Sequence, residues 1–212
     1  IWRIELNYFV RVEMVGGGYL LQDNKKRGNN MGFDLYGLNP EGDVPKPVVT
    51  DWKNTKQVDD FLNYQQDTPG SYYRANVWWW RPIWQYVCEN CDNILTEKDI
   101  ESGKFNDGHR ISKTKAKKIA SRIRRLDKQG KIMEYELEHK QHIKSLPQEE
   151  CSICDGTGRR SKPPKTGAGD MKCNACQGIG EVDNWQCHYP FESQPVVEFA
   201  EFCEQSGGFE IC

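Results

Sequence analysis

The sequence predicts a mainly helical α+β fold that combines a helical hairpin with a small β-hairpin module. Two consecutive segments between 113 and 145 carry helix signals, and two Cys-x-x-Cys pairs lie just after them. Hydrophobic residues make up only 37% of the 212-residue chain, which is lean for a globular protein. A core of this size is expected to gain stability from a metal ion that ties segments together.

Composition divides the chain into four regions. An extension or linker is indicated by three consecutive glycines, Gly16 to Gly18, and by a polar run over 23–30. Met31 would then be a natural first residue. An N-terminal hairpin is the alternative, because apolar residues alternate there as they would in a strand. The predicted regions are an extension over 1–30, a mainly helical domain over 31–150, a cysteine-rich module over 151–182, and a C-terminal helix and tail over 183–212 that packs on the main domain.

The first elements of the main domain are a short strand and a helix. A strand is predicted over 33–38, where Asn39-Pro40 ends it. A helix is predicted over 55–66, and Pro69-Gly70 closes it. Its apolar face is expected to consist of Val58, Phe61 and Leu62.

Aromatic residues dominate 71–87, where Pro82 is expected to mark a helix start. A Trp-rich surface could stack on nucleobases. A lean chain also uses Trp and Tyr to fill its core, and we favour that interpretation because few charges interrupt the segment. Thr96 and Asp99 then resemble an N-cap with an acidic first turn.

The clearest helix covers about 113–129, with Ser112 as its N-cap and Gly130 beyond its end. Its apolar stripe at helical spacing comprises Ala116, Ile119, Ala120, Ile123 and Leu126. A second helix over 131–145 completes the helical hairpin. Further along, a closing helix is predicted over 194–205, and 209–212 is expected to be a tail or edge strand.

Charge is distributed unevenly along the chain. Residues 104–131 hold eleven Lys and Arg against two acids, although the whole chain has a net charge of −2. Such a basic block predicts an acidic partner, either nucleic acid or protein, and a solvated helix surface is the alternative. The predicted contact residues are Lys113, Lys117, Lys118, Arg122, Arg124, Arg125 and Lys128.

The strongest motif is an internal repeat of Cys-x-x-Cys-x-Gly-x-Gly. It starts once at Cys151 with Cys154, and again at Cys173 with Cys176, with eighteen residues between the two pairs. This spacing is typical of a four-thiolate zinc site, and four protein ligands leave no open position for catalysis. We therefore predict one structural Zn²⁺ in a zinc-bound β-hairpin. An iron–sulfur cluster and a pair of disulfides are the alternatives.

This repeat resembles the cysteine-rich zinc module of DnaJ-type co-chaperones over residues 151–180. The resemblance implies a zinc hairpin that can bind polypeptides. Two departures limit it: the co-chaperone module has four repeats and two zinc ions, and this chain has no His-Pro-Asp tripeptide. From Met31 onward the chain also looks like uncharacterised proteins of bacteria and their phages.

Cys88 and Cys91 form another Cys-x-x-Cys pair. They could hold a second metal together with Cys187, His188 or Cys203, or act as a redox pair. The alternative is two reduced structural cysteines, because no matching second pair exists in the sequence.

The function expected from these patterns is a non-catalytic zinc protein that binds its partner through the basic helix. A chaperone-like binder of polypeptides is one alternative. A metal-dependent nucleic-acid enzyme that uses His109 is the other, although a polar turn over 106–109 explains that histidine equally. No apolar run long enough for a membrane span occurs, and thiolate ligands indicate a reducing compartment, hence the cytoplasm. The sequence leaves the oligomeric state open.

Overall fold

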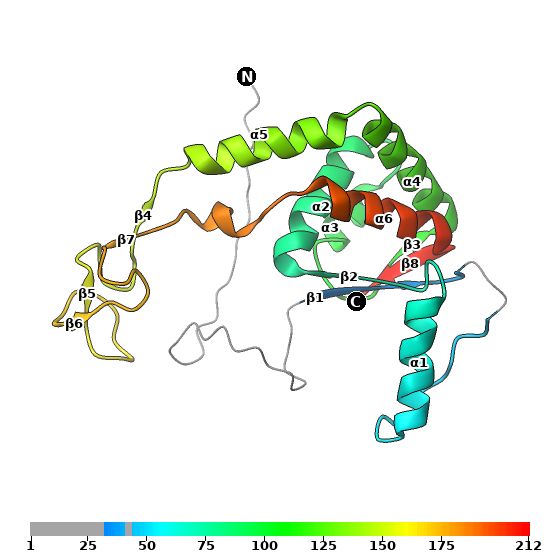
Figure 1. Cartoon of the computed structure of the whole chain (residues 1–212), viewed down its shortest axis with the longest axis horizontal. Helices are drawn as coiled ribbons and strands as arrows, with labels where there is room; N and C mark the ends of the chain where they lie inside the picture. The colour runs from blue at the N-terminus through cyan, green and yellow to red at the C-terminus, as the bar shows by residue number, and fades with distance from the viewer. Residues whose placement is uncertain (1–31, 41–43) are drawn as a thin grey trace. The chain divides into compact units, whose positions relative to one another are not determined.

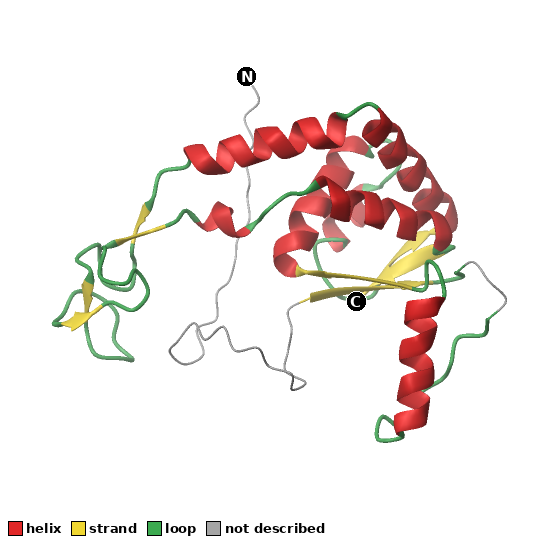
Figure 2. Cartoon of the chain, in the orientation of Figure 1, coloured by secondary structure: helices red, strands yellow, loops and turns green. Residues whose placement is uncertain are grey.

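The computed structural model describes residues 32–40 and 44–212. The predicted extension over 1–30 therefore lies outside the described residues. The described chain divides into two compact units. One is a small module over Pro147–Asn184, and the other contains the remaining described residues on both sides of that module. Among the described residues, helix outweighs strand and every sheet is antiparallel (Figures 1 and 2).

Six α-helices and one 3₁₀ helix occur in the described residues. They are α1 (Thr55–Asp67), α2 (Val77–Asn90), α3 (Glu97–Ser102), α4 (Lys113–Lys128), α5 (Lys131–Ser145), η1 (Trp185–His188) and α6 (Ser193–Gln205). No helix in this part of the chain combines the length and apolar character needed to cross a membrane.

The larger unit contains one four-stranded sheet in the order β2-β1-β8-β3. Its strands are β1 (Gly32–Gly37), β2 (Tyr72–Asn76), β3 (His109–Ser112) and β8 (Gly208–Ile211). The C-terminal strand β8 lies between β1 and β3, so Leu35 pairs with Ile211 on one side and Ile111 with Phe209 on the other. The expectation of a tail or edge strand at 209–212 is thus wrong. β8 is internal because β3, for which no strand was predicted, gives it a second partner.

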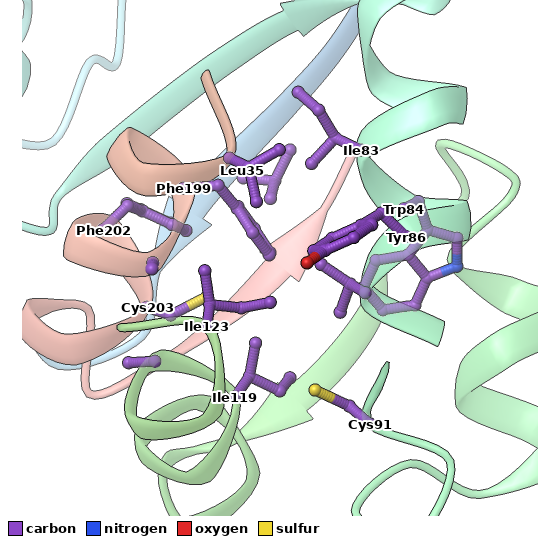
Figure 3. Packing of buried hydrophobic residues seen from close by; sticks show 14 of the residues in the cluster. Leu35, Ile83, Trp84, Tyr86, Cys91, Ile119, Ile123, Phe199, Phe202 and Cys203 are labelled. Carbon is purple, nitrogen blue, oxygen red and sulfur yellow. The ribbon is translucent and has the colours of Figure 1, made fainter. Parts of the chain in front are cut away.

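Helices α2, α4 and α6 pack on the sheet and form the core with it. The apolar stripe of α4 is fully buried at Ala116, Ile119 and Ile123. In Figure 3, Ile123 lies beside Cys203 of α6, and Ile119 lies toward Cys91. The main packing partner of α4 is therefore α6 rather than α5. The two helices of the predicted hairpin follow each other in the sequence, but the contact between them forms little of the core.

Helix α2 starts five residues earlier than expected. Asn76 caps it, since its side chain accepts from the backbone N–H groups of Trp78 and Trp79. Pro82 lies inside the helix, so the prediction that it marks the helix start is wrong. A strong N-cap fixes the start, and the proline costs one helical hydrogen bond within a well-packed segment.

The tryptophans of this segment have two different environments. Trp80 and Trp84 stack on each other with ring centroids 5.4 Å apart, and both are buried. Their indole N–H groups donate to the carbonyls of Gly103 and Ile100. Trp78 is 42% exposed and packs against Tyr189 near the surface. The interpretation of this segment as core is thus confirmed for Trp80 and Trp84 but not for Trp78.

The predicted apolar face of α1 is wrong at Leu62, whereas Val58 and Phe61 are partly buried. Helix α1 forms over almost the predicted residues, yet Leu62 is 52% exposed and Tyr64 is the residue that is buried. The helix has little of the core to cover, so its amphipathic pattern does not determine its orientation.

We expect Ile119→Ala to lower the free energy of unfolding by about 2–5 kcal/mol, because it leaves a cavity in a closely packed core. Leu137→Ala is the matched control, since Leu137 is 57% exposed on α5 and should cost less than about 0.5 kcal/mol. Urea unfolding followed by circular dichroism measures both. Equal costs for the two variants would contradict the assignment of α4 to the core.

Candidate functional site

Four cysteines meet inside the small module. The sulfur atoms of Cys151, Cys154, Cys173 and Cys176 all lie within 4.8 Å of one another, and all four residues are buried. Across the two pairs, the Sγ–Sγ distance is 3.9 Å from Cys151 to Cys173 and 3.7 Å from Cys154 to Cys176. Four sulfurs placed tetrahedrally at about 2.3 Å from one ion would be about 3.8 Å apart. The cluster therefore has the dimensions of a tetrahedral metal site and could hold a metal ion.

The two repeats pack as near-equivalent halves. The backbone N–H of Cys151 donates to the carbonyl of Gly180 at 2.8 Å, and that of Cys173 donates to the carbonyl of Gly158 at 2.9 Å. The first cysteine of each repeat is thus bonded to the last glycine of the other repeat. Two short ladders flank the cysteines: β4 (Glu149–Glu150) pairs with β7 (Glu181–Val182), and β5 (Arg159–Arg160) pairs with β6 (Met171–Lys172).

The last glycine of each repeat is required for two reasons. Gly158 and Gly180 both have positive φ, at 70° and 98°. A Cβ atom on Gly158 would clash with the backbone of Gly178, and one on Gly180 would clash with the backbone of Gly156. The N–H of Gly180 also donates to the sulfur of Cys176 at 3.3 Å, which stabilises a thiolate at that position. The repeat therefore encodes both the ligands and the close contact between the two halves.

Cys88 and Cys91 lie in a different environment. Among the described residues, no group of three or more potential ligand side chains includes either of them. Burial raises the pKa of Cys88 to about 12 and that of Cys91 to about 11, so both are protonated thiols at neutral pH. Cys91 packs in the core of the larger unit, and burial likewise raises the pKa of Cys203. Burial and protonation of this kind are typical of structural cysteines rather than reactive thiols.

A surface groove of about 790 Å³ follows the outer face of α4. Five basic side chains line it together with polar and apolar neighbours, and no acidic residue does. The lining consists of Asn93, Ile94, Lys113, Thr114, Lys117, Lys118, Ser121, Arg122 and Arg125. The opposite face of α4 is buried in the core, so the side chains of α4 that line the groove point outward.

The structure brings together five of the seven predicted contact residues in this basic groove. Arg122 is held in place, because its guanidinium donates to the carbonyl of Asn90 at 2.7 Å and to the side chain of Asn93 at 3.1 Å. Arg124 instead forms an ion pair with Glu204 of α6, and Lys128 lies outside the groove lining. Sequence spacing alone could not distinguish the groove-lining basic residues from Arg124 and Lys128, because charged residues lie on both sides of the apolar stripe.

The groove carries an uncompensated positive charge. Lys113, Lys117, Lys118 and Arg125 make no ion pair with any residue in the described ranges. Lys113 and Lys117 are four residues apart on one helix, where like charges repel. A site of this kind is stabilised by any ligand that supplies negative charge.

A buried carboxylate next to α4 forms a network that the sequence did not reveal. Asp99 is only 4% exposed, and its oxygens contact His109 Nε2 at 3.0 Å and the ammonium group of Lys115. Thr96 completes a capping box with Asp99, as its sequence position had indicated. The network therefore connects α3, β3 and the first turn of α4.

Hydrogen bonding dominates the electrostatics of Asp99. Burial alone would raise its pKa, but hydrogen bonds from Lys115, Thr96 and His109 lower the pKa well below the ordinary value. The ring of His109 is thus engaged with a structural carboxylate. Among the described residues, only the four-cysteine cluster offers three or more potential metal ligands, so His109 belongs to no such group.

Comparison with known proteins adds no relative. No protein-family model, no curated protein and no solved structure matches the chain. Only the geometry of the four-cysteine cluster and of the α4 groove therefore points to a function.

We expect Asp99→Asn to lower the free energy of unfolding at pH 7 by about 3 kcal/mol, because it removes the buried carboxylate that Lys115 and His109 contact. The folded pKa of Asp99 lies below the unfolded value of about 3.9. Its stabilisation is therefore complete above that value and is lost as the pH falls toward the folded pKa. Urea unfolding between pH 7 and pH 2.5 measures this loss, which should be smaller in the variant.

The exposed Asp60 of α1 offers the matched control. Asp60→Asn should leave both the stability and its pH dependence close to those of the parent. If Asp99→Asn and Asp60→Asn showed the same acid dependence, the proposed contribution of the Asp99 network would be wrong.

Proposed function

We propose that this protein binds nucleic acid through phosphate contacts in the basic groove on α4. The observation that supports this proposal is a groove with five basic lining residues and no acidic one. Lys and Arg that neutralise phosphates release condensed counterions, which supplies most of the sequence-independent affinity for nucleic acid. Nucleic acid is favoured over an acidic protein because the charges follow one helix face over several turns, as a continuous backbone of phosphates requires.

We further propose that the four cysteines hold one structural Zn²⁺. The interatomic distances fit, the donors are all thiolates, and a fully coordinated ion has no site for a substrate. A bound ion would supply a cross-link between the two repeats and neutralise thiolate charge in a module with almost no other apolar core. All nine cysteines are free, which is consistent with a reducing compartment, and on that basis we propose the cytoplasm.

The role of the groove can be tested by charge removal. The triple variant Lys117→Gln, Lys118→Gln, Arg125→Gln should bind a fluorescent 20-base-pair DNA duplex more weakly. The slope of log K against log [NaCl] should become shallower by about 2–3, since each lost phosphate contact removes about 0.9. Fluorescence anisotropy over a series of salt concentrations measures both quantities.

The matched control removes the same charge from other helix faces. Arg124→Gln, Lys131→Gln, Lys140→Gln replaces three side chains that form ion pairs with Glu204, Glu134 and Glu136. This variant should keep the parent slope. Identical slopes for the two triple variants would overturn the groove as the nucleic-acid site, and binding only to an acidic polypeptide would replace nucleic acid by protein as the partner.

Removal of one ligand tests the metal proposal. Cys173→Ser should lose zinc and destabilise the module by several kcal/mol, as loss of a structural metal does. Elemental analysis of the purified protein gives the zinc content, and limited proteolysis within 151–182 reports the folding of the module. Cys187→Ser is the control, because Cys187 lies outside the cluster.

The parent is expected to contain one zinc per chain. Two zinc ions per chain would indicate that Cys88 and Cys91 also bind metal. Visible absorbance together with bound iron would indicate an iron–sulfur cluster in place of zinc. A Cys173→Ser protein with the zinc content and melting temperature of the parent would exclude the structural-zinc proposal.

A further inference from the structure

Charge is separated between the two ends of the four-cysteine module. The ladder of β4 and β7 carries Glu149, Glu150 and Glu181, and Asp183 follows directly. The other ladder, β5 and β6, carries Arg159, Arg160 and Lys172. Strands that occupy equivalent positions in the two repeats therefore have opposite charge.

The separation results from the strand pairing. Along the sequence, the two inner strands β5 and β6 carry the basic residues, and the two outer strands β4 and β7 carry the acidic ones. The two outer strands pair with each other, and so do the two inner strands. This pairing collects the basic residues on the hairpin over 159–172, which we call the basic tip.

The basic tip has a strong excess of positive charge. It contains five basic residues and one acidic residue, Asp170. The basic residues are Arg159, Arg160, Lys162, Lys165 and Lys172. Arg159 donates to the backbone carbonyl of Asp170, and Arg160 donates to the side chain of Asn174 at 2.7 Å. Within the part of the chain that the structure describes, none of the five forms an ion pair with a carboxylate.

The backbone of the basic tip is ordered by its own hydrogen bonds. The N–H of Ser161 donates to the carbonyl of Gly167 at 2.9 Å, and the N–H of Gly169 donates to that of Arg159 at 3.2 Å. Asp155 accepts from the N–H of Ala168 at 3.3 Å, so one nearby carboxylate bonds to the backbone. Lys162, Lys165 and Lys172 are all exposed. The tip thus presents lysines on a fixed loop.

We propose that the basic tip is a second phosphate-contacting surface, which binds the backbone of the same class of nucleic acid as the α4 groove. The partner class rests on the proposed function, but the residues are different and lie in the other unit. Phosphate is favoured because it matches the charge of the tip, and the acidic ladder at the other end of the module would repel the same backbone. Two contact surfaces on one chain also raise the overall affinity above that of either alone.

The test uses the full-length, zinc-loaded chain and two fluorescent probes, a 20-nucleotide single strand and a 20-base-pair duplex. The tip variant is Lys162→Gln, Lys165→Gln, Lys172→Gln. Its salt slope for the duplex should be shallower than that of the parent by about 2–3, and its affinity at low salt should fall. The proteolysis pattern and zinc content should equal those of the parent, because the three lysines are exposed and none is among the potential metal ligands.

The control variant Lys53→Gln, Lys56→Gln, Lys98→Gln removes the same charge from exposed positions outside the tip and the groove. Equal slopes for the tip and control variants with both probes would overturn the proposal, whatever the groove variant does. If the tip variant loses binding and the groove variant does not, the tip is upheld and the α4 proposal fails. Loss of binding to polyglutamate with unchanged nucleic-acid binding would assign the tip to an acidic protein and overturn the proposal.

Discussion

Burial of one face of α4 is the constraint on which the larger unit depends. Ala116, Ile119 and Ile123 are fully buried against α6 and the sheet, and the core extends outward from this contact. The rotation of α4 about its axis is fixed by that burial, because a helix has only one stripe of this kind. Most of the other side chains of α4 are basic, so the interaction that stabilises the fold also determines where the positive groove lies.

Side-chain contacts at both ends of α4 strengthen this arrangement. At its first turn, Lys115 is bonded to the buried Asp99, which also holds His109 of β3. Further along, Arg124 is paired with Glu204 of α6. These two residues of the basic helix therefore have structural partners. Of the basic residues of α4 that form no ion pair among the described residues, Lys128 lies outside the groove and the others line it, where they can bind a ligand.

The small module depends on a different kind of interaction. Its buried core consists of the four cysteines, with only a few partly buried apolar neighbours. Hydrophobic burial of that extent is too small to order a chain of this length, which is why a metal ion is an effective stabiliser there. The mutual bonding of the two repeats brings the sulfurs together, and the same pairing of strands separates acidic from basic residues. Ligand geometry and surface charge thus share one structural origin.

The sequence by itself determined the elements with strong local signals. The helices at 113–128 and 131–145, the capping box at Thr96, and the four cysteines follow from spacing, caps and glycines, which act over a few residues. The tertiary structure alone decided the features that need distant partners. β8 is internal because β3 pairs with it across about a hundred residues, and Asp99 meets His109 and Lys115 through that same fold. Likewise, the choice of groove residues depends on which face of α4 is buried, and such non-local contacts leave no periodic trace in the sequence.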